Sequence, residues 1–388
     1  MSDMSAQVGI VGAGPAGLLL SHLLHRQGIG SVVLEIRSRS YLEQRVRAGV
    51  LEQGTVDLLN DCGLGARMRR EGLIHHGVEL RFSGRSHRID FGELTGGRGI
   101  TVYGQQEVVK DLLRAREAAG SLPRFEVADV SVADLTTERP VIRFTHGGAD
   151  HELRCDVIAG CDGFHGICRP SVPDGALTEF DRTYPFGWLG ILAEVAPSTD
   201  ELIYARHERG FALHSMRSPT LSRFYLQCEP DADPADWPDE RIWDELRVRL
   251  DLDLAEGPIV DKGVTPMRSY VVEPMQYGRL YLAGDAAHIV PPTGAKGLNL
   301  AVADVRVLAT ALGRFFTAGD DAGLRAYSET CLRRVWRAEH FSWWMTSMLH
   351  RFPDDQGFEQ KLQLSQLEYV TSSAAAAASL AENYVGLP

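Results

Sequence analysis

The first forty residues alternate between apolar runs and a glycine-rich break. Residues 8–11 form a short apolar run, and residues 18–25 repeat apolar side chains at helical spacing. Between them lie residues 12–17, with the sequence GAGPAG, and a second apolar run over 31–34 ends in Glu35. A short apolar run is typical of a buried strand, and a repeat of three to four residues is typical of a helix. The pattern therefore predicts a strand, a tight turn, a helix and a second strand.

The glycine-rich break has the Gly-x-Gly-x-x-Gly spacing of a dinucleotide-binding turn, with an acidic residue about 20 positions further on. Gly12 permits the tight turn, Gly14 lets a pyrophosphate approach the backbone, and Gly17 lets helix and strand pack closely. The start of the helix offers free N–H groups to phosphates. Glu35 is placed to accept hydrogen bonds from a ribose. The alternative is a glycine turn that binds no nucleotide.

Two further motifs and a change of pattern extend this interpretation. Asp162-Gly163, followed by Arg169, comes directly after a strand-like run, and Gly284-Asp285 follows another. Between them, several short β-like runs indicate an antiparallel sheet, and helical sequence continues to the end of the chain. We therefore predict an α/β fold with a Rossmann-like FAD-binding domain over 1–178 and 266–320, an inserted β-sheet substrate domain over 179–265, and a C-terminal helical region over 321–388.

The overall charge argues against broad electrostatic binding to nucleic acid or anionic membranes. The 388 residues carry 40 Lys and Arg against 52 Asp and Glu, a formal net charge of −12. Such binding would require a basic surface. No stretch reaches the ~20 apolar residues of a membrane span, and the first apolar run lacks the basic start of a secretion signal. We expect a cytoplasmic protein.

Cysteine usage fits a reducing compartment. The six cysteines include no Cys-x-x-Cys pair and no disulfide-like spacing. The nearest approach to a metal cluster is Cys161, His165 and Cys168, which supplies three ligands, whereas structural zinc sites use about four. We therefore predict no metal site.

A short hairpin in the predicted sheet is a candidate for anion binding. If its strands pair about Thr220, residue 217 lies opposite 223 and residue 215 opposite 225. Ser215, Arg217, Arg223 and Tyr225 then project from one face. Two opposed arginines repel each other unless an anion lies between them, and a guanidinium with two hydroxyls suits a carboxylate. The alternative is a solvent-exposed hairpin without a ligand.

The three nucleotide-type motifs together resemble the single-component FAD-dependent aromatic hydroxylases. The stretches that carry the resemblance are 45–54, 184–190, 284–300, 341–345 and 381–388, and it extends over residues 7–388. It implies a resident FAD, with NADPH or NADH and dioxygen as co-substrates. It also implies a homodimer and the conversion of 4-hydroxybenzoate to 3,4-dihydroxybenzoate through a flavin hydroperoxide.

The resemblance assigns residues to the FAD. It places Glu35 at the ribose and Asp285 at the ribityl chain. A helix that begins at Lys296 would face the pyrimidine edge of the flavin, where a helix N-terminus stabilises negative charge. The complete implied set is Gly12, Gly14, Gly17, Glu35, Arg45, Arg47, Gln105, Asp162, Arg223, Asp285, Lys296, Gly297, Leu298 and Asn299.

The resemblance also assigns residues to the substrate and the coenzyme. Ser215, Arg217 and Tyr225 would hold the benzoate carboxylate, and Tyr204 and Tyr384 would contact the substrate hydroxyl. The remaining implied residues are His75 as the proton exit, Pro292 and Thr293 beside the substrate, and Arg37, His165 and Arg268 for the coenzyme. Arg37 and Arg39 could meet a 2′-phosphate, which favours NADPH over NADH.

Two other functions compete with this interpretation. One is a hydroxylase for a different phenolic acid, such as 3-hydroxybenzoate, which should alter the set Ser215, Arg217, Tyr225 and Tyr204. The other is a flavin-binding sensor without turnover. The hydroxyl relay argues against the sensor, because a protein that only binds flavin has no proton to export.

Overall fold

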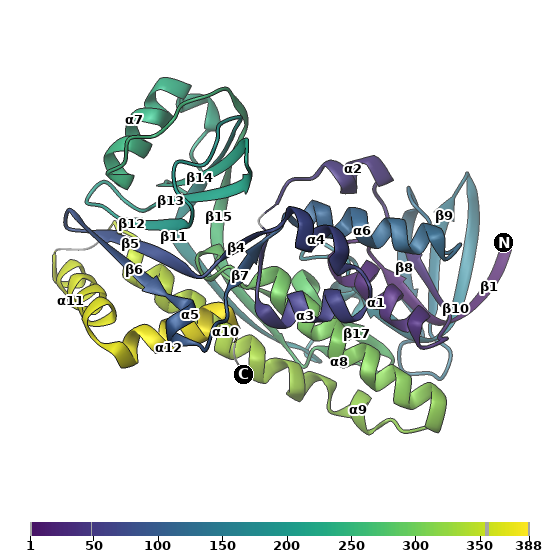
Figure 1. Ribbon diagram of the computed structural model, residues 1–388. Helices are drawn as coiled ribbons and strands as arrows, with labels where there is room; N and C mark the ends of the chain where they lie inside the picture. Colours follow the sequence, from purple (N-terminus) through teal and green to yellow (C-terminus); the bar gives the residue numbers. More distant parts are fainter. Residues whose placement is uncertain (1, 48, 354–356, 387–388) are drawn as a thin grey trace.

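The computed structural model describes residues 2–47, 49–353 and 357–386. Ala48, Leu387 and Pro388, which belong to the family-like stretches 45–54 and 381–388, lie outside the described residues. Two large sheets lie side by side along the molecule, and long helices run beneath both (Figure 1). The predicted α/β class, with helices at the C-terminus, is confirmed.

The first sheet is built around the N-terminal strand. Its central order is β16-β17-β10-β1-β2, and the pairs that β1 forms with β10 and β2 are parallel, as is the pair β10–β17. β9 adds antiparallel to β10, and β8 to β9. The strands are β1 (Ser2–Val11), β2 (Ser31–Leu34), β8 (Ala128–Ala133), β9 (Val141–His146), β10 (Ala149–Gly160), β16 (Gln276–Tyr277) and β17 (Leu280–Leu282).

Three helices associated with the first sheet position the nucleotide motifs. α1 (Pro15–Arg26) follows the glycine turn and packs against α6 (Gln105–Ala118) and α8 (Gly297–Ala318). Val8 and Ile10 have no exposed surface, and Leu18, Leu20 and Leu24 of α1 are equally buried. This burial follows from the apolar periodicity, since a central parallel strand is covered on both faces. The carboxyl ends of β1 and β10 consequently lie beside the start of α1.

The second sheet has eight strands in the order β18-β15-β11-β14-β13-β12-β5-β6, and all its pairs are antiparallel except β12–β5. It draws β5 and β6 from the N-terminal part of the chain, so it is wider than segment 179–265. The predicted domain boundaries stay a prediction. Its strands are β5 (Gly77–Phe82), β6 (Arg85–Asp90), β11 (Thr178–Ala193), β12 (Leu202–Arg206), β13 (Ala212–Ser218), β14 (Leu221–Cys228), β15 (Ile259–Glu273) and β18 (His288–Ile289).

Helices cover both faces of the second sheet. α7 (Asp239–Leu250) packs on one face around Phe224 and Leu226, and the C-terminal helices pack on the other around Tyr204 and Trp188. The alternation of side chains along β13 and β14 supplies both cores. The helices on this second face are α10 (Tyr327–Leu349), α11 (Phe358–Ser372) and α12 (Ala374–Val385), whereas α9 (Ala322–Arg325) packs on α8.

A small third sheet joins the two halves, in the order β3-β7-β4. Its strands are β3 (Val50–Leu51), β4 (Leu73–His75) and β7 (Ile100–Val102), and the nearby helices are α2 (Arg39–Gln44), α3 (Gln53–Asp61), α4 (Gly65–Glu71) and α5 (Phe91–Leu94). Short 3₁₀ turns occupy Arg169–Ser171, Pro234–Asp236, Gly284–Ala286 and Pro292–Gly294. Within the described ranges, none of the helices is both long and apolar enough to cross a membrane.

Candidate active site

The glycine turn has the geometry that its spacing predicts. Gly12 has φ +99°, and a Cβ there would lie 2.3 Å from the carbonyl oxygen of Cys161. A Cβ on Gly17 would lie 2.0 Å from the carbonyl oxygen of Gly12, so side chains are excluded at both positions. Gly14 has no atom within 4 Å of a Cβ position, which leaves its backbone open to a ligand. The turn therefore fits a pyrophosphate at the start of α1.

Glu35 lies at the end of β2 and braces this turn. Its Oε2 accepts a hydrogen bond of 2.7 Å from the Ala13 N–H, and its Oε1 accepts one of 2.8 Å from the Arg37 N–H. A carboxylate oxygen can accept two hydrogen bonds, so both oxygens keep capacity for a ribose. The ribose contact itself stays a prediction.

The second motif contains a buried acceptor without a partner. Asp162 Oδ2 accepts a hydrogen bond of 2.8 Å from the Cys168 N–H, while Oδ1 is buried and unpaired among the described residues. Burial raises the pKa of this carboxyl group. Arg169 donates to the carbonyl oxygens of Phe164 (2.8 Å) and Ala286 (3.2 Å), which ties the second motif to the third. A buried unpaired oxygen is costly, and a polar ligand would satisfy it.

The third motif rests on a buried ion pair. The Gly284 N–H donates to Asp304 Oδ2 over 3.0 Å, and His288 Nε2 lies 2.7 Å from the same oxygen. Asp304 belongs to α8 and His288 to β18, and both are buried. Burial lowers the pKa of His288, but the Asp304 charge outweighs it and the net shift is upward. The pair fixes the backbone beside Asp285, whose side chain is exposed.

The three motifs together can accommodate FAD. The open backbone at Gly14, the orphaned Asp162 oxygen and the exposed Asp285 side chain are the groups that a phosphate and a ribityl chain require. Gly297, at the start of α8, also has no atom within 4 Å of a Cβ position. The hydrogen-bonding groups of the three motifs therefore match FAD, the cofactor that the sequence predicts.

Segment 37–47 carries Arg45 and Arg47, which are predicted for FAD, and Arg37, which is predicted for the coenzyme. Arg37 and Arg45 both lie over the Tyr41 ring, at 5.3 and 5.5 Å from its centroid. Arg47 is exposed overall. Partial desolvation of its guanidinium, and secondly the positive charge of Arg45, lower its pKa, whereas the Asp285 carboxylate acts to raise it. Gln105 is the first residue of α6.

The predicted helix start is found, but its lysine does not provide a free charge. α8 begins at Gly297, after Ala295 in the left-handed region with φ 54°. The Lys296 ammonium is buried and lies 2.6 Å from Glu52 Oε1, so its charge is already matched. Asn299 Oδ1 accepts from the Glu52 N–H and the Thr55 hydroxyl, and Leu298 is partly buried. Lys296 therefore already has a carboxylate partner, and its predicted position at the flavin stays a prediction.

The hairpin that carries the predicted anion site forms in a register that differs from the predicted one. Arg223 lies opposite Ser215, and Tyr225 lies opposite Leu213, because a bulge between Met216 and Ser218 displaces the turn. The pairing of 217 with 223 and of 215 with 225 is therefore wrong by two residues. A shift of two preserves the face to which each side chain points.

The predicted carboxylate-binding group nevertheless comes together. Arg217 Nη1 donates to Ser215 Oγ over 2.8 Å, and its Nη2 donates to Tyr225 Oη over 3.3 Å. Arg217 Nε is buried without a partner among the described residues. Burial lowers the pKa of this guanidinium. Arg223 turns away to Asp261, at 3.2 Å, so the two arginines do not face one anion as a pair.

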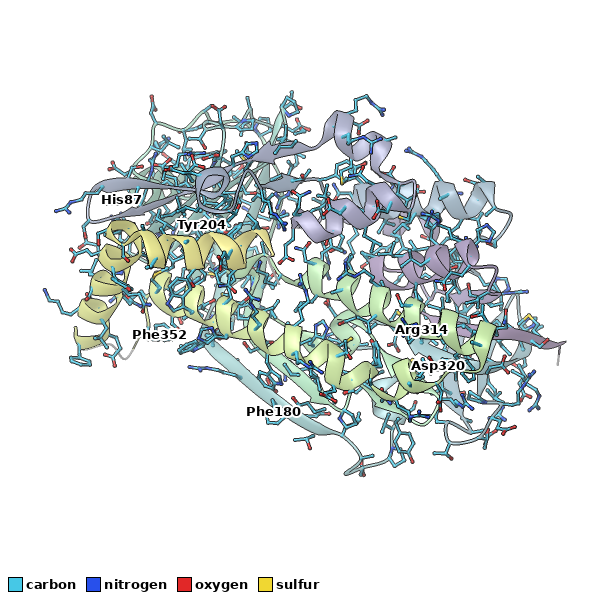
Figure 2. All side chains as sticks on the ribbon, turned by 60° about the horizontal axis from the view of Figure 1, so that its bottom comes forward. His87, Phe180, Tyr204, Arg314, Asp320 and Phe352 are labelled. Atoms are coloured by element: carbon cyan, nitrogen blue, oxygen red, sulfur yellow. The ribbon has the colours of Figure 1, made fainter. Side chains whose placement is uncertain are left out.

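Two buried phenols meet on the neighbouring strand β12, where Tyr204 lies opposite Leu213 and Leu213 lies opposite Tyr225. Tyr204 of β12 and Tyr384 of α12 are hydrogen-bonded through their hydroxyls, and each side chain is about 1 % exposed. Figure 2 shows Tyr204 beside the C-terminal helix, drawn in yellow. Burial raises the pKa of both phenols above the usual value, so both stay protonated at neutral pH.

His75 ends β4 and is almost fully buried. Neither ring nitrogen has a hydrogen-bond partner among the described residues, and burial lowers its pKa to about 4 despite Glu201 and Asp200. Its predicted link to the phenols is therefore not made directly. Pro292 is exposed, whereas Thr293 is buried and accepts a hydrogen bond of 2.9 Å from Thr346.

Two of the three residues predicted for the coenzyme, His165 and Arg268, lie beside one aromatic ring, that of Phe164. Phe164 lies between two guanidiniums, those of Arg169 and Arg268, each 4.6 Å from its centroid, and its ring meets His165 edge-on at 5.0 Å. Arg268 Nε donates to Asp181 over 2.7 Å. Arg39 forms ion pairs with Glu43 and Glu117. Of the two arginines in segment 36–41, Arg37 is therefore the one better placed to bind a phosphate.

Sequence reasoning missed the acidic partners of the buried cations. Glu52, which pairs with Lys296, is distant in sequence and follows no recognisable spacing. Asp304 carries a usable signal, because it is the single acidic residue of α8 and lies among buried apolar residues. Among the described residues, no group of three or more His, Cys, Asp or Glu is arranged to hold a metal ion.

Comparisons with known proteins agree with this geometry. Residues 5–342 match the family described as "FAD binding domain". The chain is 50 % identical over 392 residues to a p-hydroxybenzoate hydroxylase from Acinetobacter baylyi, covering 100 % of this chain and 97 % of that protein. It is 30 % identical to a 6-methylpretetramide 4-monooxygenase from Streptomyces rimosus, with 76 % and 72 % covered.

A solved structure shares the fold at low sequence identity. The p-nitrophenol 4-monooxygenase from Pseudomonas putida DLL-E4 matches with a TM-score of 0.85 over 100 % of both chains, at 19 % identity. The family match and the 50 % identical relative decide the chemistry, and the nucleotide motifs decide the cofactor. The chain is an aromatic-ring monooxygenase that uses FAD, and it belongs to the FAD-dependent aromatic hydroxylases.

Proposed function

We propose that this enzyme converts 4-hydroxybenzoate to 3,4-dihydroxybenzoate. One dioxygen and one NAD(P)H are consumed with a proton, one oxygen atom enters the ring ortho to the hydroxyl, and the other leaves as water. The observation that carries the proposal is the pairing of two chemically distinct sites on one sheet, a guanidinium with two hydroxyls and a pair of buried phenols. A ring with a carboxylate at one end and a hydroxyl at the other matches both.

Arg217 binds the substrate carboxylate in this proposal. Its Nη atoms already contact Ser215 and Tyr225, so the fork is held in place before substrate arrives. Its unpaired Nε–H can donate to a ligand. A hydrogen bond to a charged group contributes about 1.5–3 kcal/mol, and a fork selects a planar carboxylate over other anions.

The phenol pair acts on the substrate hydroxyl. Electrophilic attack on the ring is fastest when that hydroxyl is ionised, yet a buried site disfavours the charge. Since burial keeps Tyr204 and Tyr384 protonated, one hydroxyl can donate to the developing phenolate while the other carries a proton away. His75 is neutral at pH 7 and can receive that proton through intervening water.

The cofactor-binding residues hold FAD beside this pocket. When bound, FAD supplies acceptance of hydride from NAD(P)H and activation of dioxygen. The glycine turn with Glu35 and the Asp162 motif would hold its AMP half and pyrophosphate, and Asp285 its ribityl chain. His165, Arg268 and Arg37 would meet the coenzyme, and the engagement of Arg39 by two glutamates leaves Arg37 to recognise the 2′-phosphate of NADPH. The proposal includes a cytoplasmic homodimer.

The proposal is tested with the purified yellow holoprotein. NADPH oxidation is followed with and without 4-hydroxybenzoate, and the products are separated by chromatography. We expect 4-hydroxybenzoate to accelerate the oxidation and to yield 3,4-dihydroxybenzoate in proportion to NADPH. 3-Hydroxybenzoate serves as the isomeric control. Absence of 3,4-dihydroxybenzoate, or a better yield of product from the 3-hydroxy isomer, would contradict the assignment.

A further inference from the structure

A buried charge cluster lies between the start of α8 and the end of α12. The Lys296 ammonium is 2.6 Å from Glu52 Oε1, and the two side chains are only 5 % and 3 % exposed. Arg334 of α10 pairs with the other Glu52 oxygen. Glu52 follows the short strand β3, so three segments distant in sequence meet at one carboxylate.

The same lysine holds the end of the C-terminal helix. Its Nζ donates to the carbonyl oxygens of Asn383 and of Tyr384, the latter over 3.2 Å. Carbonyls in the last turn of a helix lack partners within the helix, and a cation there is favourable. The three donors of the ammonium are thus matched by Glu52 and two α12 carbonyls. The ammonium also lies 5.7 Å from the centroid of the Tyr384 ring.

The residue after α12 is shaped by the same carboxylate. Gly386 has φ +79°, and a Cβ there would lie 2.2 Å from Glu52 Oε2. Its backbone N–H caps α12 by donating a hydrogen bond to the carbonyl oxygen of Glu382. Arg337 adds a hydrogen bond of 3.2 Å to the Asn383 side chain. We call residues 383–386 the C-terminal strap.

We propose that Lys296 and Glu52 are positioning residues, which fix the C-terminal strap so that the Tyr384 hydroxyl meets Tyr204 and the substrate hydroxyl. This inference rests on the proposed function. Lys296 directly precedes α8, so one ammonium links the helix predicted to face FAD to the phenol that serves the substrate. A buried ion pair adds little net stability compared with apolar packing, but it defines one arrangement of the groups around it.

The test must move the C-terminal strap without changing any charge. Gly386→Ala does so, because the added methyl group meets Glu52 and displaces the end of α12. Gly319→Ala is the matched control. Gly319 caps α8 with φ +67° and has no atom within 4 Å of a Cβ position, so it carries the same backbone strain far from Tyr384.

Both variants are purified as holoproteins and compared with the unmodified chain. The readouts are FAD content, melting temperature, the fraction of bound 4-hydroxybenzoate that is ionised across pH, and product formed per NADPH. We expect a lower melting temperature in both because of the strained backbone, and a larger loss in Gly386→Ala, whose methyl group also meets Glu52. Only Gly386→Ala should require higher pH to ionise bound substrate and lose turnover about ten-fold, since small misplacements in a catalytic site cost that much or more.

The inference fails if Gly386→Ala matches Gly319→Ala in substrate ionisation and in product yield. If Gly386→Ala does not retain FAD, the same comparison is made with Asn383→Ala. Asn383→Ala removes only the contact of the Asn383 side chain with Arg337 and one hydrogen bond within α12. Its control is Glu382→Ala, at the exposed neighbouring position. Failure of the proposed function is distinguishable, since the unmodified chain itself would then form no 3,4-dihydroxybenzoate.

Discussion

At the scale of single residues, the strongest expectation concerns the shape of Arg217. Arg217→Lys keeps the positive charge but loses the fork that contacts both Ser215 and Tyr225. Loss of one charged hydrogen bond of about 1.5–3 kcal/mol corresponds to a Kd for 4-hydroxybenzoate roughly 10- to 150-fold higher. Titration of the flavin absorbance with substrate measures this Kd.

The exposed Arg85→Lys provides the control for Arg217, because Arg85 lies at the start of β6 on the surface. FAD content should be the same in both variants. An unchanged Kd in Arg217→Lys would show that the carboxylate is bound elsewhere.

At the scale of elements, the pair formed by Asp304 and His288 joins α8 to β18 and to the Gly284 backbone. Asp304→Asn removes the negative charge, so the imidazolium form of His288 would be buried without a matching carboxylate. Removing one partner of a buried pair costs about 3 kcal/mol or more. We expect a lower free energy of unfolding and faster release of FAD, seen as a rise in flavin fluorescence on dilution.

The sign of the pH effect follows from the raised pKa of His288. The stabilisation is fully present below pH 6.5 and is lost as pH rises through the folded-state pKa. Asp304→Asn should therefore cost more stability at pH 6 than at pH 9. Asp320→Asn, on an exposed connection between α8 and α9, is the control and should change neither readout.

Within single elements, local sequence patterns explain which parts of the site could be predicted from the sequence. The glycine turn is local, so Gly12 and Gly17 could be assigned from spacing alone. Ser215, Arg217 and Tyr225 could be placed together because side chains alternate with a period of two, which survives a register error of two residues. The bulge that caused this error depends on packing that no local pattern records. The pairing of Lys296 with Glu52 could not be predicted for a related reason, since 244 positions separate the two residues.

At the scale of the whole molecule, buried histidines make stability depend on pH. His75, His214 and His350 are spread over separate elements, and burial lowers the pKa of each, to about 4, about 4 and about 3. Each imidazole is therefore neutral in the folded protein. His350 even accepts a hydrogen bond of 2.7 Å from Trp188 through Nε2, which requires the proton to be on Nδ1.

These lowered values predict acid sensitivity. The unfolded chain binds protons at each histidine near pH 6.5 while the folded chain does not, so the free energy of unfolding falls as pH decreases from 6.5 towards 4. At pH 5 each such histidine costs about 2 kcal/mol, which is a large fraction of the stability of many domains. Glu339, whose pKa burial raises to about 7, takes up a proton in the folded state over the same range and offsets part of this loss. Denaturant unfolding at pH 7 and pH 5, followed by tryptophan fluorescence, measures the loss.

His214→Gln measures the contribution of one histidine to this acid-induced loss of stability, at a residue outside the proposed catalytic group. His214 is fully buried, and its Nδ1 lies 3.1 Å from the Thr199 hydroxyl, which a glutamine can also reach. The variant should lose about 2 kcal/mol less than the unmodified chain between pH 7 and pH 5. The comparison uses the difference between the two pH values, so a constant packing defect in the variant cancels. An identical loss in both chains would mean that His214 is already protonated in the folded state, against the burial that lowers its pKa.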